Sequence, residues 1–237
     1  MFVGPWALWL GRKYGLPVIY TYHTRYEEYL HYIPCLRINE RSTPVKKKAV
    51  EWIQKKVIPS YMKWFCNRCD MVFAPSAGMQ QMIRGYGVNT PIAIFPTGLD
   101  DSYFRRNVKR AQEIRTEYSR GKKHLFVTVS RLEKEKNYGF LLRGIAELRH
   151  EAGDDFHVLI IGDGSQKSQL KVGTSILGIQ DMVTFAGNIP NDQVKDYLSA
   201  ADLFLFASKS ETQGIVLAEA MAAGTPVVAV HATGADD

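Results

Sequence analysis

The sequence contains no apolar run long enough to span a bilayer, and its first residues lack the pattern of a secretory signal. The opening stretch has neither a basic start, nor a long apolar middle, nor a small-residue cleavage site. We therefore expect a cytoplasmic protein. The apolar and charged fractions, 46% and 23%, are those of an ordinary globular protein, which argues against a disordered chain.

Cysteine is scarce, with three residues in the chain, Cys35, Cys66 and Cys69. Cys66 and Cys69 have the spacing of half a zinc site or of a redox pair. A structural zinc site needs four converging ligands, and the sequence contains no second pair that would complete it. We therefore expect reduced, partly buried thiols and no bound metal.

The charge is unbalanced toward the basic side, with a formal net charge of +6 at neutral pH. Such a balance favours an anionic partner, which leaves nucleic acid, a nucleotide or an anionic membrane. The sequence has no zinc finger, no aromatic RNA-binding strand pattern and no basic heptad array. We therefore expect no nucleic-acid partner.

The second half of the chain alternates apolar, β-rich runs with helical patterns. This alternation predicts an α/β fold with a doubly wound parallel sheet, whose strands are continuously apolar because helices cover both faces. The expected strands of the second half are residues 124–130, 157–162, 182–187, 203–208 and 226–231. The first half has similar but sparser units, with strands expected at residues 17–23, 70–76 and 91–96.

A polar, charged stretch between the halves suggests the domain boundary. We predict a partial N-terminal Rossmann-like domain at residues 1–106, a linker with one surface helix at 107–121, and a C-terminal Rossmann-like domain at 122–237. The first half starts with a helix that runs into a strand, without the earlier strands that such a sheet needs. The chain also stops directly after a strand, so we expect both domains to be incomplete.

Two carboxylates, Glu211 and Glu219, bracket the predicted start of a helix that follows an apolar strand. Gly214 allows close backbone approach, and the free N–H groups and dipole of a helix start favour an anion. The carboxylates are suited to accept hydrogen bonds from the hydroxyls of a sugar or ribose. This arrangement suggests a nucleotide-sugar site. The alternatives are the acid and base of a glycosidase, or two solvated acids without function.

Charged and glycine-rich turns follow two of the other predicted strands. Arg131 offers a planar fork and Lys136 a point charge, a suitable pair for a diphosphate at the carboxyl edge of a parallel sheet. Their alternative is a solvated loop in which Glu133 and Glu135 cancel the lysines. Gly162 allows the backbone to approach a ligand and is assigned to a wall of the nucleotide pocket, with a plain turn as the alternative.

In the first half, His23 ends the predicted strand at residues 17–23. A histidine at the carboxyl end of a strand can project into a cleft and donate to a sugar hydroxyl or a developing charge. A purely structural histidine is the alternative reading.

A predicted helix at residues 45–65 carries Val45, Ala49, Trp52, Ile53 and Val57 on one side. Tryptophan beside lysines resembles an interfacial helix on an anionic bilayer. An ordinary amphipathic surface helix is the alternative. The residues expected to contact the membrane are Lys46, Lys47, Lys48, Trp52 and Lys55.

Five segments, taken in order, resemble glycosyltransferase family 4, the retaining GT-B enzymes. They are TYHTRYEEYLHY, FPTGLD, VSRLEKEKN, GDGSQKSQL and ETQGIVLAEAMAAGTPVVA, which together extend over almost the whole chain. The strongest element is the Glu-x7-Glu motif, here Glu211 to Glu219. The resemblance implies an enzyme with two Rossmann-like domains that face each other across a cleft.

The resemblance also implies roles for individual residues. Arg131 and Lys136 would bind the donor diphosphate, Glu211 would hold the donor sugar, and Glu219 would accept from the ribose. His23 would act near the reacting sugar, which makes His23 and Glu211 the expected catalytic residues. The backbone amides expected at the phosphate and sugar are those of Gly214, Ile215, Val216 and Leu217. No metal or other cofactor is expected.

Within the family, the segments TYHT, YEEYLHY and FPTG are most similar to those of bacterial diacylglycerol glucosyltransferases. This similarity implies UDP-glucose as donor, a lipid such as diacylglycerol as acceptor, and a peripheral position on the inner face of the cell membrane. A soluble or polysaccharide acceptor, or a non-catalytic fragment that binds the nucleotide sugar, are the alternatives. Thr97 and Asn137 depart from the family pattern, which often has Asn and Gly there.

Overall fold

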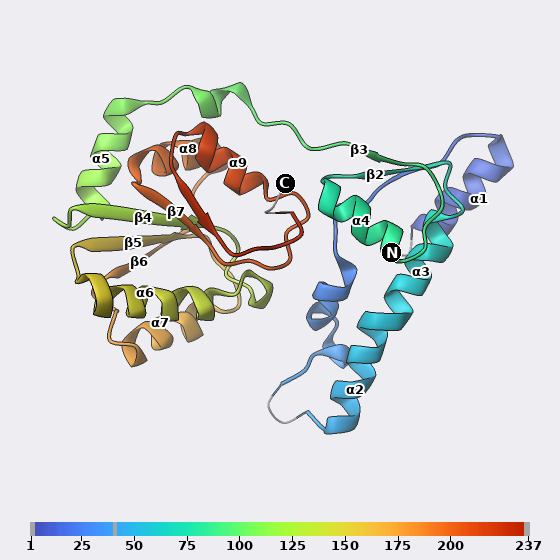
Figure 1. The fold of residues 1–237 in the computed structure, drawn as a ribbon, viewed down its shortest axis with the longest axis horizontal. Helices are drawn as coiled ribbons and strands as arrows, with labels where there is room; N and C mark the ends of the chain where they lie inside the picture. The colour runs from blue at the N-terminus through green and yellow to red at the C-terminus, as the bar shows by residue number, and fades with distance from the viewer. Residues whose placement is uncertain (1–2, 40–41, 235–237) are drawn as a thin grey trace. The chain divides into compact units, whose positions relative to one another are not determined.

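The computed structural model describes residues 3–39 and 42–234, which fall into two compact units divided between Thr97 and Gly98 (Figure 1). The division precedes the predicted linker at residues 107–121. Helix α5 (Val108–Tyr118) lies within that predicted linker, yet it is packed on the second unit through Ile114, which is fully buried. Arg115 of α5 also forms an ion pair with Asp202 at 2.8 Å, so the helix is part of the second unit.

The first unit is built on a parallel three-stranded sheet in the order β1-β2-β3. Its strands are β1 (Ile19–Thr21), β2 (Met71–Ala74) and β3 (Ile92–Ile94). Its α-helices are α1 (Gly4–Tyr14), α2 (Pro44–Trp52), α3 (Ile58–Cys66) and α4 (Ala77–Gly85). Two 3-10 segments, η1 (Tyr26–Tyr32) and η2 (Pro34–Leu36), follow β1, and the π-helical η3 (Ile53–Val57) joins α2 to α3.

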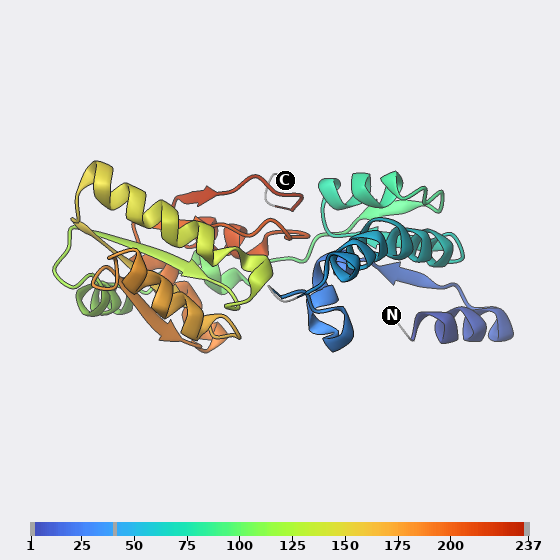
Figure 2. The same cartoon turned by 90° about the horizontal axis from the view of Figure 1, so that it is seen from below.

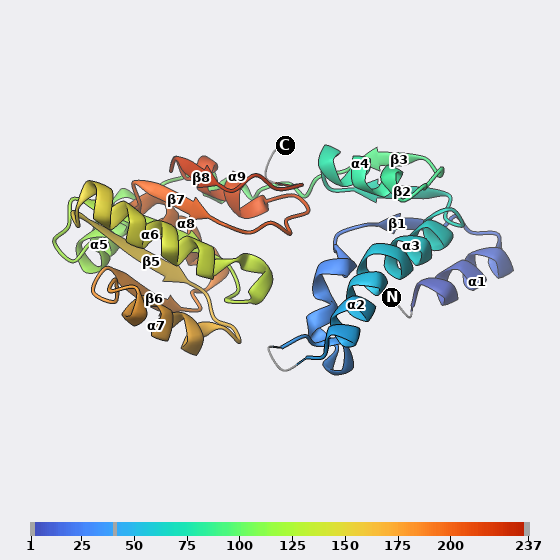
Figure 3. The same cartoon turned by 60° about the horizontal axis from the view of Figure 1, so that its bottom comes forward.

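Helix α4 has a side-chain N-cap and a buried apolar face. Ser76 is its N-cap, because the Ser76 hydroxyl accepts from the amide of Met79 at 3.2 Å. Met79 and Ile83, one turn apart, are fully buried against the sheet. The α2, η3 and α3 segments form one continuous helical rod (Figure 3), so Pro59, at the start of α3, does not end it.

The cysteines are free thiols, and two of them are buried in the first unit. Burial raises the pKa of Cys66 to about 12 and that of Cys69 to about 11. Both groups therefore stay protonated at neutral pH, which makes them unreactive core residues.

The second unit has a five-stranded parallel sheet in the order β6-β5-β4-β7-β8. Its strands are β4 (His124–Val129), β5 (Phe156–Ile161), β6 (Val183–Gly187), β7 (Leu203–Phe206) and β8 (Val227–Ala229). After α5, its α-helices are α6 (Tyr138–Ala152), α7 (Lys167–Ile176), α8 (Asn191–Ala200) and α9 (Ile215–Ala222). Two short 3-10 turns, η4 (Asp101–Phe104) and η5 (Lys134–Lys136), complete the unit.

Helices cover both faces of the second sheet, as the continuous apolar strands predict. Figure 1 shows α6 and α7 on one face and α5, α8 and α9 on the other, and Figure 2 shows α6 and α7 side by side. Every residue of β5 is buried, and its side chains alternate between the two layers. Leu159 and Ile161 join the core under α8 and α9, whereas Val158 and Ile160 join the core under α6 and α7.

The predicted α/β class with two parallel-sheet units is confirmed. At the start of α8, Asn191 is the first helical residue. The N-cap position is Pro190, whose fixed φ suits a helix start although it offers no capping side chain.

Candidate functional site

The strand order of the second unit brings three loops to one edge of its sheet. Strand β4 lies between β5 and β7, and all three run parallel. Their carboxyl ends therefore point the same way, and ligands of open parallel sheets bind at this edge. The three loops contain the predicted Arg131 and Lys136, the predicted Gly162, and the predicted Glu211.

Lys136 and Glu211 meet at the centre of this edge. The Lys136 Nζ lies 2.5 Å from Glu211 Oε1, and the two side chains are only 14% and 15% exposed. One residue comes from η5 after β4 and the other from the loop after β7, so the pair joins two loops 75 residues apart in sequence. The structure thus brings together a cation and an acid that the sequence motifs place apart.

Asn137 supports this junction and accounts for one departure from the family pattern. Its backbone is left-handed, with φ 57°, a conformation that asparagine tolerates better than most non-glycine residues. Its side-chain amide donates to the carbonyl of Ala207 at the end of β7, at 3.2 Å. Asparagine therefore provides the turn that glycine would allow and adds a hydrogen bond between the loops.

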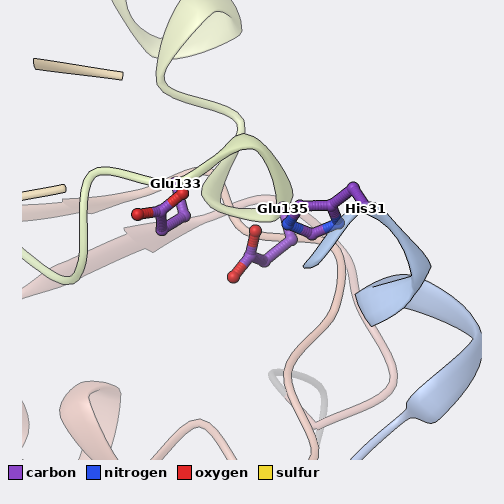
Figure 4. A group of neighbouring side chains, drawn as sticks. All are labelled: His31, Glu133 and Glu135. Carbon is purple, nitrogen blue, oxygen red and sulfur yellow. The ribbon is translucent and has the colours of Figure 1, made fainter. Parts of the chain in front are cut away.

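The acids beside Arg131 both form contacts within the second unit. The Glu135 side chain is 2% exposed and lies 3.4 Å from Arg131, which is 58% exposed. The carboxylate of Glu133 accepts from the amide and hydroxyl of Ser165 at 2.9 and 2.6 Å. Figure 4 shows both carboxylates projecting from the turn after β4; His31, also drawn there, belongs to the first unit.

Gly162 is required by the close approach of the loops after β4 and β5. Its φ is +129°, and a Cβ at this position would lie 2.0 Å from the carbonyl oxygen of Ser130. The Gly162 amide donates to the carbonyl of Gly187 at 2.7 Å. The absence of a side chain at Gly162 therefore lets the loop after β5 pack directly against the backbone that carries Arg131.

Gly214 starts α9 in a left-handed conformation, with φ +67°, and packs against the carbonyl of Gly234. The amides of Ile215 and Val216 lie in the first turn of α9, where a helix offers no intrahelical acceptor. The Leu217 amide donates to the Gly214 carbonyl at 2.8 Å. The helix start beside Glu211 thus has the N–H groups and positive dipole end that an anion requires.

Glu219 lies on α9 beside Tyr103, a residue that the sequence motifs do not single out. Burial raises the pKa of Glu219, and the neighbouring Tyr103 phenol opposes this rise. Tyr103 is itself buried, and burial together with the Glu219 charge raises its pKa to about 12. Tyr103 stands next to Phe104 in a charged stretch that the sequence assigns to the region around the domain boundary, and no local pattern marks it.

His23 lies in the first unit, two residues beyond the end of β1, and is exposed. The site geometry described above belongs to the second unit alone. The sequence predicts a strand that ends at His23 itself, whereas the observed strand ends at Thr21 and His23 lies in the turn that follows it.

Comparison with known families identifies the class of protein. Residues 109–237 match the family model described as glycosyl transferases group 1, and residues 1–103 match the model described as glycosyltransferase family 4. Because the first match covers more than half of the chain, the protein belongs to the group 1 glycosyl transferases. The resemblance drawn from the sequence motifs is confirmed.

Two curated relatives act on different acceptors according to their names. An alpha-monoglucosyldiacylglycerol synthase of Streptococcus pneumoniae is 32% identical over 96% of this chain and 49% of its own length. A 2-deoxystreptamine glucosyltransferase of Streptomyces kanamyceticus is 27% identical over 98% of this chain and 58% of its own length. The chain therefore spans about half the length of these relatives.

Among solved structures, Anabaena HepE in complex with UDP-glucose is similar, with a TM-score of 0.72. The sequences are 21% identical, and the match covers 98% of this chain and 58% of HepE. At this identity the likeness concerns the fold, and it confirms the GT-B class. Within the described residues, we find no helix with the length and apolar character needed to cross a membrane.

Proposed function

We propose that the whole protein transfers a glucosyl residue, with retention of configuration, from UDP-glucose to a lipid acceptor such as diacylglycerol. The observation that carries the proposal is the Lys136–Glu211 pair at the start of α9. It places a cation for a phosphate next to an acid for sugar hydroxyls. In a nucleotide sugar, the phosphate and the sugar hydroxyls lie next to each other, so the ligand matches both side chains.

In this proposal the donor diphosphate lies against Arg131, Lys136 and the first amides of α9. The two cations and the helix dipole stabilise negative charge as the nucleoside diphosphate departs. This provides the electrophilic assistance that a metal ion supplies in other transferases. We accordingly propose that the reaction requires no divalent metal.

Two carboxylates hold the remainder of the donor. Glu211 accepts hydrogen bonds from hydroxyls of the transferred sugar, and Glu219 accepts from the ribose. Strong hydrogen bonds to ionised carboxylates fix a substrate in one orientation. The burial that raises the Glu219 pKa also strengthens such a bond by excluding water.

The transfer step is proposed to use no enzymic nucleophile. The acceptor hydroxyl oxygen attacks the anomeric carbon on the face from which the diphosphate leaves, and its proton passes to the departing phosphate oxygen. His23 is proposed to donate to the sugar from the first unit as charge develops.

A glucosyltransferase assay on the full-length protein tests the proposal. We expect incorporation of glucose into lipid when the protein is incubated with UDP-glucose and vesicles containing diacylglycerol, with EDTA present. Transfer only to a soluble sugar would instead support a soluble acceptor, the alternative that the name of the 2-deoxystreptamine glucosyltransferase suggests. Binding of UDP without any transfer would instead support a nucleotide-sugar-binding protein.

We further propose that the α2–η3–α3 rod lies on an anionic membrane surface. Val45, Ala49 and Trp52 are exposed on α2, and Trp52 is 62% exposed. Lys47, Lys48 and Lys55 are exposed on the same rod, whereas Lys46 is partly buried. Exposed tryptophan flanked by lysine is the composition of an interfacial helix and is unfavourable on a surface that faces only water.

Replacing Lys47, Lys48 and Lys55 together by Gln is expected to weaken binding to anionic vesicles by about 10- to 100-fold, because each lysine near such a surface contributes up to about 1 kcal/mol. Flotation with vesicles of phosphatidylglycerol and phosphatidylcholine measures the bound fraction. The matched control replaces Lys109, Lys123 and Lys171, exposed lysines of the second unit, by Gln. Equal binding of both triple variants would contradict the proposed surface.

A further inference from the structure

The turn that carries His23 is held between two buried residues of the first unit. Tyr22, just before His23, is fully buried, and its amide donates to the carbonyl of Phe73 in β2 at 2.8 Å. Glu27, four residues after His23, is 9% exposed although it is a carboxylic acid. Burying a carboxylate costs free energy unless the group is paired or hydrogen-bonded. The partners of Glu27 therefore indicate its role in the structure.

Glu27 connects three elements that are distant in sequence. Its Oε1 accepts from the phenol of Tyr86, at the end of α4, at 2.9 Å, and from Arg25 Nε at 3.3 Å. The Glu27 carbonyl accepts from the side chain of Gln54, in the π-helical η3, at 2.9 Å. Glu27 thus fastens the start of η1 to α4 through its carboxylate and to the rod through its backbone carbonyl.

Aromatic contacts also connect the two ends of this turn. The rings of Tyr22 and Tyr26 lie 6.2 Å apart, and the hydroxyls of Tyr20 and Tyr26 are 3.2 Å apart. His23 and Thr24 therefore lie in the middle of a turn whose two ends are fixed. A shift of the Glu27 end would rotate the peptide that carries His23.

We propose that Glu27, held by Tyr86, is a positioning residue that sets the orientation of His23 for glycosyl transfer. This inference rests on the proposed function, since it assumes that His23 acts in the transfer step. Neither Glu27 nor Tyr86 is part of the donor site in the second unit. Their substitution is therefore expected to change the transfer step through His23 and not the binding of the donor.

Replacing Tyr86 by Phe in the full-length protein removes the hydrogen bond to Glu27 with little change of shape. We expect kcat for transfer from UDP-glucose to fall about 10- to 100-fold, the cost of a misplaced reacting group, while KM for UDP-glucose stays within about twofold. Glu27→Gln is expected to have an effect of similar size. In a His23→Ala background, Tyr86→Phe is expected to cause no further loss, because its action passes through His23.

Thr90→Val is the control for a general loss of stability. Thr90 is buried in the same unit, and its hydroxyl donates to the carbonyl of Cys66 at 2.9 Å, remote in sequence from the His23 turn. We expect this variant to lower the melting temperature and leave kcat unchanged. The positioning role is overturned if Tyr86→Phe lowers only the melting temperature, or if its effect on kcat persists in full without His23. A wild type that binds UDP but transfers to no acceptor would overturn the proposed function, and this inference with it.

Discussion

Replacing Lys136 by Ala is expected to lower kcat for glucosyl transfer about 100- to 1,000-fold, the effect typical of removing one preorganised group from a developing charge. The proposed role of Lys136 is to neutralise the departing diphosphate. The substitution also leaves Glu211, with a side chain only 15% exposed, without its cation. An unpaired acid at the phosphate site repels the donor, so UDP affinity is expected to fall as well.

Lys134→Ala provides the matched control. Lys134 lies in the same short turn and has the same charge, but it is exposed. We expect its transfer rate and UDP affinity, measured by radiolabel incorporation and calorimetry, to stay within about threefold of wild type. If Lys136→Ala behaved like Lys134→Ala, the 2.5 Å contact would be an ion pair of structural value alone, and the donor site would lie elsewhere.

Replacing Gly162 by Ala is expected to lower the free energy of unfolding of the second unit by about 3 to 5 kcal/mol, the sum of backbone strain and overpacking. The positive φ of +129° strains any side chain, and a Cβ would lie 2.0 Å from the Ser130 carbonyl oxygen. Because that carbonyl belongs to backbone next to Arg131, relief of the clash would also move the proposed phosphate site.

Two other glycines separate these causes. Gly178 has φ +67° with no atom within 4 Å of the position that a Cβ would take, so Gly178→Ala tests strain without crowding and is expected to cost about 1 kcal/mol. Gly144 lies inside α6 with open space, so Gly144→Ala is expected to stabilise by about 0.5 to 1 kcal/mol. Urea unfolding measures all three, and a Gly162→Ala loss no larger than that of Gly178→Ala would contradict the close approach.

The periodicity of the sequence was sufficient for the fold class. The run at residues 158–161 is apolar without alternation, and the structure places β5 in the interior of a sheet covered on both faces. The boundary of the units was harder to predict. Helix α5 carries many charges, and its tertiary contacts, the buried Ile114 and the Arg115–Asp202 ion pair, show that it belongs to the second unit.

The sequence predicted single residues of the candidate site but not the contacts between them, because those contacts join distant segments. Arg131, Lys136 and Glu211 stand out because charged groups directly follow apolar strands. Tyr103 and Glu27 could not be found this way, since their importance comes from partners in distant elements, Glu219 and Tyr86. No local pattern marks a buried acid or phenol whose partner is far away in the chain.

The sequence by itself determined the family, the order of strands and helices, and which charged residues follow the strands, because these depend on local periodicity and short motifs. Only the tertiary structure decided that Lys136 pairs with Glu211, that Gly162 must lack a side chain, and that the buried Glu27 accepts from Tyr86. Each of these facts depends on strand order and side-chain burial. Both arise when segments far apart in the chain pack against each other.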